Sequence, residues 1–433
     1  MYCGNCLRDN ALVQALRHLG HEVLMVPLYL PLTLDEPDQS NAPIFFSGIN
    51  VYLEQKSALF RHAPGWLHRL LASRRLLNWA AGRASRTQAA QLGELTLSMI
   101  RGEAGNQARE LEELIAWLKT QPKPDVIFLS NVLLIGFARR LQEQLRTPVV
   151  CVLQGEDYFL DGLPEPHRKA CWQSLGERTE NVDLFIALSH YFAGLMRERL
   201  GLLPERVEVV YNGINLEGYK DEGPDGRDKR RNQAPVLGYF ARMCREKGLD
   251  VLVDAFIQLR KSGRAGALKL RIGGYCGPAD EPFVASLRDR LNSSGLSDQV
   301  EFCPNLDHAA KLAFLRSLSV FSVPATYGEA FGLYVLEALA AGVPVVQPRS
   351  GAFPELIEAT GGGVLCAPGQ PQSLADAIES LLLDPERARA LGRAGQQAVR
   401  ENFSAETMAA NTVKVVTGLR QQHKDRVAES PIR

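Results

Sequence analysis

Short apolar runs alternate with amphipathic segments along most of the chain. Buried strands are predicted where apolar residues follow one another, and helices where apolar side chains recur every three or four positions. In the first half of the chain the predicted strands span residues 21–30, 125–130, 148–153, 182–189 and 207–213. Strands that alternate with helices are typical of a parallel sheet covered by helices on both faces.

The same alternation restarts after "YKDEGPDGRDKRRNQA", a charged stretch with Gly and Pro that is typical of a linker. Beyond it, strands are predicted over residues 235–242, 268–275, 300–304, 320–325, 344–348 and 362–367. We therefore expect an α/β protein with two domains, in which ligands bind in a cleft at the carboxyl ends of the two sheets. The expected division is residues 1–218 for the first domain, 219–233 for the linker, 234–403 for the second domain, and 404–433 for a C-terminal helix and polar tail.

The chain opens with "MYCGNCLRDN", and apolar residues recur at helical spacing from Leu12 to Leu19. Asp9 and Asn10 are both suitable helix caps, so the residues before them are predicted to form a loop. Cys3 and Cys6 have the spacing of a redox or metal motif, but two further metal ligands are not evident in the sequence. The favoured interpretation is that both cysteines are loop residues at a helix start.

Residues 56–93 interrupt the alternation of strands and helices. This segment is basic, contains no acidic residue, and carries Trp66, Trp79 and several leucines. One interpretation is an inserted helical pair that packs on the first domain. The alternative is a cationic amphipathic element that contacts an anionic membrane surface or surrounds an acceptor.

Composition narrows the classes of function. Lys plus Arg and Asp plus Glu both number 49 among 433 residues, so overall charge indicates no nucleic-acid partner. No apolar run approaches the ~20 residues that a membrane span needs. The other cysteines are scattered among apolar neighbours, as expected for a reducing cytoplasm.

The stretch "VPATYGEAFGLYVLEALAAGVPVVQP" is the most informative for chemistry. Glu329 and Glu337 are eight positions apart, and Gly328 and Gly332 allow a tight loop before a helix. Free backbone N–H groups at that helix start, over residues 331–333, would bind an anion or sugar hydroxyls. Acidic residues before helices also occur simply because they interact with the helix dipole, so the pair alone leaves both interpretations open.

A second stretch, "GYFARMCREKGLD", follows the first strand of the second domain. It places Arg242 and Lys247 beside a turn at the carboxyl end of that strand. A forked Arg contact and a Lys point charge suit a diphosphate. A solvated charged turn is the alternative, and the presence of both stretches in one domain favours the ligand site.

Together, Asn212-Gly213, "GYFARMCREKG" and "YGEAFGLYVLEALAAGVPVV" resemble the retaining glycosyltransferases of family 4, and the resemblance covers nearly the whole chain. It implies the GT-B fold, two Rossmann-like domains facing across a cleft. Arg242 and Lys247 would stabilise the donor diphosphate, Glu337 would bind the ribose hydroxyls, and Glu329 would contact the donor sugar. The remaining implied donor contacts are the backbone N–H groups of Phe331, Gly332 and Leu333. The resemblance implies no metal and no cofactor, and the sequence has no Asp-x-Asp pattern.

The first domain departs from the family in two places. Family members commonly have a His where this chain has "QGEDYF", so Glu156 or Asp157 is predicted to contact the acceptor or act as a base. A capped turn leading into a helix is the alternative. The family also begins with a strand and a glycine-rich loop, so we expect that the first strand is missing here. Gly4 and Asn5 would then lie in the loop near the donor or acceptor.

The expected function is a cytoplasmic, metal-independent, retaining glycosyltransferase that moves a sugar from a nucleoside-diphosphate sugar to an acceptor hydroxyl. The sequence leaves open the nucleobase, the sugar, the oligomeric state and the acceptor, which would be a glycan, a lipid or a small molecule. Two alternatives remain. One is a nucleotide-sugar epimerase or phosphorylase of the same fold, and the other is a binding protein that is inactive because its first strand is missing.

Overall fold

The computed structural model describes residues 4–28, 36–40, 42–46, 89–219 and 234–429. The described chain divides into two compact units, each of which has its own parallel sheet. Unit 1 is made of described residues from 1–11, 34–37 and 212–408, and unit 2 of those from 12–33, 38–211 and 409–433.

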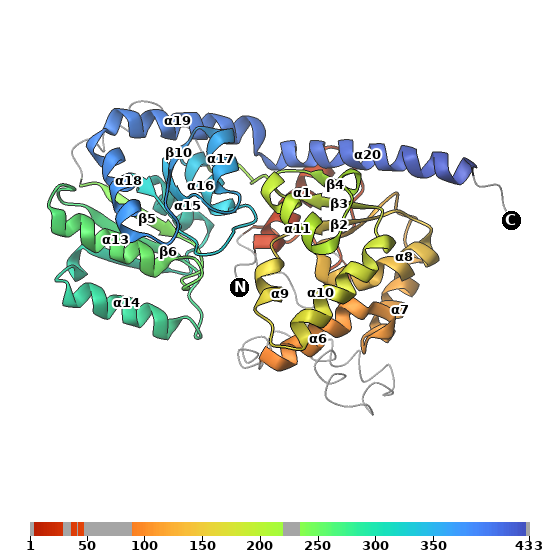
Figure 1. Ribbon diagram of the computed structural model, residues 1–433. Coiled ribbons are helices and arrows are strands. Elements are labelled where there is room, and N and C mark those ends of the chain that lie inside the picture. Colours follow the sequence, from red (N-terminus) through yellow and green to blue (C-terminus); the bar gives the residue numbers. More distant parts are fainter. Residues whose placement is uncertain (1–3, 29–35, 41, 47–88, 220–233, 430–433) are drawn as a thin grey trace. The chain divides into compact units, whose positions relative to one another are not determined.

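Unit 2 contains a parallel sheet with strand order β1-β2-β3-β4 (Figure 1). Its strands are β1 (Ile127–Leu129), β2 (Val149–Leu153), β3 (Leu184–Ala187) and β4 (Val207–Val209). All residues of β2 and β3 are buried, as expected for strands covered on both faces. Four of the five strands predicted for this half of the chain are confirmed.

Helices connect and cover these strands. Ser189 caps α11 because its hydroxyl oxygen accepts a hydrogen bond from Phe192 N (3.1 Å). Gly201 ends the same helix in the left-handed conformation. The α-helices described here are α6 (Ala89–Arg101), α7 (Ala108–Leu118), α8 (Ala138–Leu145), α9 (Asp157–Asp161), α10 (His167–Arg178) and α11 (His190–Leu200). Short 3₁₀ helices span Gly102–Ala104, Val132–Phe137, Thr179–Asn181 and Pro204–Arg206.

Unit 1 contains a parallel sheet with strand order β10-β9-β8-β5-β6-β7. Its strands are β5 (Val236–Phe240), β6 (Lys269–Gly274), β7 (Val300–Pro304), β8 (Val320–Phe321), β9 (Val345–Pro348) and β10 (Gly363–Cys366). All six strands predicted here are confirmed, although β8 is short. The order is that of a doubly wound, Rossmann-like sheet, in which the first strand lies next to the second and the fourth.

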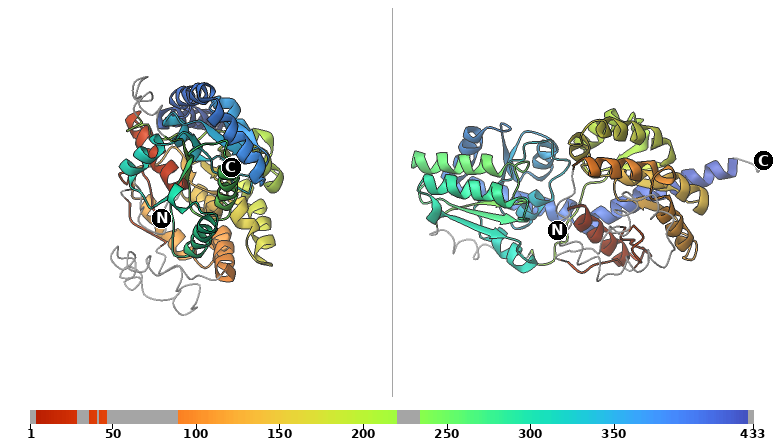
Figure 2. Two further views of the ribbon diagram at one scale, coloured as in Figure 1. Left: turned by 90° about the vertical axis from the view of Figure 1, so that its left-hand side faces the viewer. Right: turned by 90° about the horizontal axis from the view of Figure 1, so that it is seen from below.

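Helices lie on both sides of this sheet (Figures 1 and 2). Helix α13 packs against α14 and α18, and α19 packs against α16 and α17. Their bounds are α13 (Leu249–Ser262), α14 (Glu281–Ser293), α15 (His308–Arg316), α16 (Leu333–Ala340), α17 (Phe353–Thr360), α18 (Pro371–Leu383) and α19 (Pro385–Asn402).

The predicted N-terminal loop is wrong for the residues that the structure describes. Helix α1 spans Gly4–His18, so Gly4, Asn5 and Cys6 are helical. The two expected caps lie inside the helix, where Asn10 Nδ2 donates to Pro37 O (3.1 Å) and Asp9 pairs with Arg8. Both side chains bond to other groups, and the helix begins before them, so neither caps its start. Cys3 lies outside the described residues.

The predicted strand over 21–30 is also wrong over its described part. Residues 21–28 form no strand, although Phe46 N donates to Leu28 O (2.9 Å). Leu24 is 43% exposed, so this apolar run is not buried on both faces. A strand requires a neighbour along its length, and no ladder forms beside residues 21–28 in the described chain.

Several predicted features lie partly outside the described residues. The linker is outside except for Tyr219, and the basic segment 56–93 is outside as far as residue 88, after which α6 begins. The C-terminal tail is helical further than the sequence indicates, because α20 spans Ala405–Glu429. No described helix combines the length and the apolar character required to span a membrane.

Gly213 provides a test of unit 1. A Cβ at this position would lie 2.0 Å from Ser404 O, beside the bridge between Ile214 and Ser404. We expect Gly213→Ala to lower the free energy of unfolding by about 1–3 kcal/mol through overpacking. Gly176 in α10 has no neighbour within 4 Å of an added Cβ, so Gly176→Ala is expected to stabilise by ~0.5–1 kcal/mol.

Urea denaturation monitored by circular dichroism measures both changes. Equal effects of the two substitutions would contradict the close approach at Gly213.

Candidate active site at the carboxyl edge of the unit 1 sheet

The candidate site lies where the strand order of the unit 1 sheet reverses. Strand β5 pairs with β6 on one side and with β8 on the other. In open parallel sheets, ligands bind beyond the carboxyl ends of strands at such a switch point. Arg242 and Lys247 follow β5, and Glu329 follows β8. The loops that carry the predicted residues therefore begin on adjacent strands.

The two loops are bonded to each other. Thr326 N donates to Glu246 O (3.0 Å), and Gly248 lies against Pro324. A Cβ on Gly248 would lie 1.9 Å from Pro324 O, and the φ of Gly248 is +69°. Both observations exclude a side chain at this position, which explains why glycine follows Lys247.

Lys247 and Glu329 form an ion pair at this point. Lys247 Nζ lies 2.5 Å from Glu329 Oε2, and the side chains are only 20% and 13% exposed. Two tyrosines complete the cluster. Tyr327 OH and Tyr334 OH donate to the same Glu329 Oε2 at 3.0 and 2.8 Å, and Lys247 Nζ donates to Tyr327 OH (2.5 Å). The sequence predicted the two charged residues and missed both tyrosines.

These contacts determine the charge of the cluster. Burial by itself raises the pKa of Glu329, but the Lys247 charge and the hydrogen bonds from Lys247, Tyr334 and Tyr327 lower it more. The net pKa is below the ordinary value of 4.5, so Glu329 is ionised at neutral pH. Burial and the nearby Glu329 charge raise the pKa of Tyr334 well above 10, so Tyr334 keeps its proton and donates.

Arg242 has a partner that the sequence analysis did not identify. Its Nε and Nη2 atoms donate to Asp280 Oδ2 (3.0 Å) and Oδ1 (2.9 Å). Asp280 is buried, whereas the Arg242 side chain is 56% exposed. Because a guanidinium has five N–H donors, this forked contact orients Arg242 and leaves donors for another anion. No local motif marks Asp280, which lies 38 positions away in the sequence.

The second glutamate also has a buried cation. Lys311 Nζ donates to Glu337 Oε1 (3.0 Å), and the Lys311 side chain is 4% exposed. Lys311 lies on α15 and Glu337 on α16, so the contact joins the helices on either side of β8. An ion pair of this kind stabilises the ionised carboxylate and restricts its orientation.

The start of α16 is built as the sequence predicts. Gly332 adopts φ +97° immediately before the helix, which begins at Leu333. Phe331 is buried with its ring 6.5 Å from that of Phe403, so its side chain anchors the loop. The first N–H groups of an α-helix lack partners within the helix, so this helix start favours an anion or hydroxyl groups.

A groove of about 320 Å³ lies at the carboxyl ends of β6 and β7. Asn305 has φ +56°, and its side-chain amide bonds to both the N–H and the carbonyl of Cys276 (3.3 Å each). The amide group of Asn305 is therefore engaged by the Cys276 backbone. The lining residues are Cys276, Glu281, Val284, Ala285, Arg288, Pro304 and Asn305.

Comparison with known proteins identifies the family of this chain. The model of the family described as "Glycosyl transferases group 1" matches residues 225–398, and that of "Glycosyltransferase Family 4" matches residues 93–217. A glycogen synthase from Mycobacterium tuberculosis is 30% identical over 345 residues, which cover 77% of each chain. The chain belongs to the group 1 glycosyltransferases.

A further relative matches over a shorter range. A GDP-mannose-dependent alpha-(1-6)-phosphatidylinositol monomannoside mannosyltransferase from M. tuberculosis is 31% identical over 49% of this chain and 56% of its own length. The chain thus spans about half the length of this relative. Among solved structures, Anabaena Alr3699/HepE in complex with UDP has a TM-score of 0.63 at 19% identity, covering 91% of this chain and all of that one. This likeness supports the GT-B fold.

In unit 2 of this glycosyltransferase, the predicted residues Glu156 and Asp157 lie where the chain passes from β2 into α9. Glu156 follows β2 and is 5% exposed. Its Oε1 accepts from Val132 N (2.9 Å) and its Oε2 from Gln154 N (2.8 Å), so it joins the loops that follow β1 and β2. Asp157 is half-buried and begins α9. These contacts give Glu156 a structural role between two loops, although its side chain does not cap α9. Contact of Glu156 or Asp157 with an acceptor stays a prediction.

At the start of the chain, the N-terminal turn of α1 lies close to α16. An added Cβ on Gly4 would lie 3.9 Å from Leu333 Cδ1, and Arg8 Nε donates to Asn212 Oδ1 (3.2 Å). Gly4 therefore lies beside the helix start described above. A role for Gly4 and Asn5 in contacting donor or acceptor stays a prediction.

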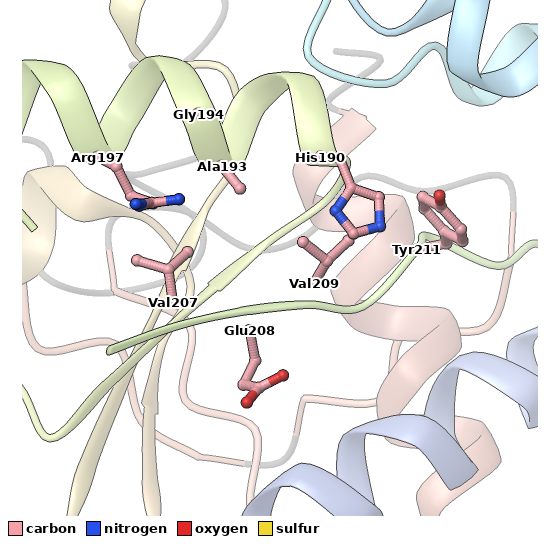
Figure 3. Close-up of a pocket in the computed structure, with 8 residues that line it drawn as sticks. All are labelled: His190, Ala193, Gly194, Arg197, Val207, Glu208, Val209 and Tyr211. Carbon is pink, nitrogen blue, oxygen red and sulfur yellow. The ribbon is translucent and has the colours of Figure 1, made fainter. Parts of the chain in front are cut away.

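Unit 2 also has a groove of about 330 Å³ between α11 and β4 (Figure 3). His190 and Arg197 point from the helix toward the strand, and the His190 and Tyr211 rings meet edge to face at 6.1 Å. The sequence analysis placed no functional residue here. The lining residues are His190, Ala193, Gly194, Arg197, Val207, Glu208, Val209 and Tyr211.

Glu156 makes the stability of unit 2 depend on pH. Burial raises the pKa of Glu156 from 4.5 to about 7, because hydrogen bonds from the backbone N–H groups of residues 132, 154 and 156 only partly compensate for lost solvation. The folded state therefore holds a proton that the unfolded state releases. This stabilisation is full below pH 4.5 and is lost as pH rises through about 7, by up to ~3 kcal/mol.

Thermal unfolding of wild type and Glu156→Gln between pH 4.5 and 8 measures this effect. We expect the variant to be less stable at pH 4.5, since its amide N–H₂ faces a backbone donor, and the difference should shrink as pH rises. Glu177→Gln, on the exposed side of α10, controls for loss of a carboxylate. A pH-independent difference between wild type and Glu156→Gln would contradict the raised pKa.

Proposed function

We propose that the chain is a retaining glycosyltransferase that moves a sugar from a nucleoside diphosphate to an acceptor hydroxyl without a metal ion. One observation carries the proposal. The Lys247–Glu329 pair lies at the switch point of a Rossmann-like sheet, on loops that also present Arg242 and the start of α16. Cations and N–H groups converge there with a carboxylate that is able to accept sugar hydroxyls.

The chemistry follows from the charge that develops in the reaction. When the bond between the sugar and the diphosphate breaks, negative charge grows on the diphosphate oxygens. Lys247 and Arg242 would stabilise this charge, and their contacts to Glu329 and Asp280 fix their positions before the reaction. The start of α16 adds backbone donors. Two cations and a helix start replace the charge of a metal ion in this scheme.

The ribose and the base would be bound beside these groups. Glu337, fixed by Lys311, is assigned to the ribose hydroxyls. The groove beside Pro304 and Asn305 is assigned to the base, with recognition through the backbone. One relative is named for GDP-mannose and one structural neighbour was solved with UDP, and these nucleotides have different bases. The base of the donor of this chain therefore stays open.

Removing either cation should abolish most transfer. We expect Lys247→Ala and Arg242→Ala to lower kcat at least ~100-fold, because each removes a group that stabilises the leaving diphosphate. The measurement is nucleoside-diphosphate release from a panel of UDP-, GDP- and ADP-sugars with candidate acceptors. Lys269→Ala is the matched control, since Lys269 begins β6 at the opposite edge of the same sheet and is exposed. Near-normal kcat in both site variants would refute the diphosphate assignment.

Transfer should not depend on a divalent metal ion. We expect kcat to be unchanged after dialysis against EDTA, because protein cations compensate the diphosphate charge. Loss of activity that Mg²⁺ or Mn²⁺ restores would contradict this part of the proposal. Proton NMR of the product tests retention, since an inverted anomeric configuration would overturn it.

A further inference from the structure

Three donors crowd one oxygen of Glu329. Lys247 Nζ, Tyr327 OH and Tyr334 OH all bond to Oε2, at 2.5, 3.0 and 2.8 Å. A carboxylate oxygen has two lone-pair sites, so these donors fill its capacity. A sugar hydroxyl therefore has no place at Oε2.

The other oxygen of this carboxylate carries no bond in the part of the chain that the structure describes. Within the described chain, Oε1 of Glu329 has no hydrogen-bond partner, and it is not among the buried unpaired atoms. Gly351 packs against the backbone of Glu329, where an added Cβ would lie 2.5 Å from Glu329 N, and Ala352 N donates to Glu329 O (2.9 Å). The backbone is fixed from one side and the carboxylate from the other. Oε1 is thus the oxygen available to a ligand.

The two tyrosines also surround Lys247. Its Nζ lies 5.0 Å from the Tyr327 ring centroid and 5.3 Å from that of Tyr334. Aromatic rings at these distances stabilise an ammonium ion. With one N–H bonded to Glu329 and one to Tyr327, the third N–H of Lys247 has no partner in the described chain.

We propose that Tyr327 and Tyr334 are positioning residues that hold Oε2 of Glu329, so that only Oε1 accepts hydroxyls of the donor sugar. This inference rests on the proposed function, and it specifies which atom of Glu329 recognises the donor sugar. The Tyr334 hydroxyl acts on the sugar through Glu329 alone and makes no contribution to binding of a free nucleoside diphosphate, whereas the Tyr327 hydroxyl also accepts from Lys247 Nζ. Lys247 turns its remaining N–H to the diphosphate while its other contacts stay in place.

The decisive comparison is between a donor and its sugar-free product. Tyr334→Phe keeps the ring and removes only an O–H donor to Glu329 Oε2, so it is the deciding variant. Tyr327→Phe also removes the hydroxyl that accepts from Lys247 Nζ and serves as a comparison. Isothermal titration calorimetry of each variant with the preferred nucleotide sugar and with its nucleoside diphosphate gives two values of Kd. A hydrogen bond to a charged group is lost, so we expect Kd for the nucleotide sugar to rise ~10-fold, with kcat lowered at least as much. In Tyr334→Phe, Kd for the nucleoside diphosphate should stay unchanged, because this hydroxyl has no hydrogen bond to Lys247 in the described chain.

Tyr191→Phe, on α11 of unit 2, is the matched control and should leave both constants unchanged. Thermal unfolding verifies that the variants fold. In Tyr334→Phe, equal weakening of both ligands, or no weakening of either, would overturn the positioning role.

A second measurement separates this inference from the proposed function. Carbon-13 NMR of the Glu329 carboxylate follows its pKa without any ligand. We expect the pKa to be higher in Tyr334→Phe than in wild type, because one lowering hydrogen bond is lost. An unchanged pKa would overturn the network itself. Wild type that binds no nucleotide, together with a raised pKa of Glu329 in the variant, would contradict the proposed function and the role assigned to Glu329 in sugar binding. The hydrogen bonds of the two tyrosines to Glu329 would still be confirmed.

Discussion

The candidate site depends on keeping a lysine and a glutamate charged while most of their surface is removed from water. Burial of either charge alone would cost several kcal/mol, and an ion pair with additional hydrogen bonds offsets that cost. Lys247 and Glu329 meet this requirement because two tyrosine hydroxyls and two aromatic rings complete their surroundings. The two charges stabilise each other and still have groups that a ligand is able to bind. In the described chain, one N–H of Lys247 and Oε1 of Glu329 have no hydrogen-bond partner.

The backbone of unit 1 makes this arrangement possible. A doubly wound sheet brings the ends of β5 and β8 together, although about 80 residues separate the two loops, as the Lys247–Tyr327 bond shows. Glycines at 248 and 351 permit approaches that any Cβ would block. The same principle recurs at each cation of the site. Arg242 and Lys311 are each bound by a carboxylate from a different element, which fixes the orientation of the cation.

Ten of the eleven strands predicted from the sequence pattern are present in the structure. The pattern succeeds because buried parallel strands are continuous apolar runs between turn residues. It failed over residues 21–28, where the apolar run is present but no ladder forms beside it in the described chain. It also placed the start of α1 too late, since Asp9 and Asn10 resemble caps but bond elsewhere. The local sequence indicates which hydrogen bonds a side chain is able to form. It does not indicate which residue far along the chain becomes its partner.

The same distinction applies to the site. Glu329, Glu337, Arg242 and Lys247 were identified from short motifs, whereas Asp280, Lys311 and the two tyrosines were not, because their significance lies in contacts across the fold. Amide hydrogen exchange with and without a nucleoside-diphosphate sugar is the most direct test of the central claim. The account predicts slower exchange in residues 242–248 and 326–333 of unit 1 on binding. Protection confined to other segments, such as α11 and β4 around the unit 2 groove, would contradict it.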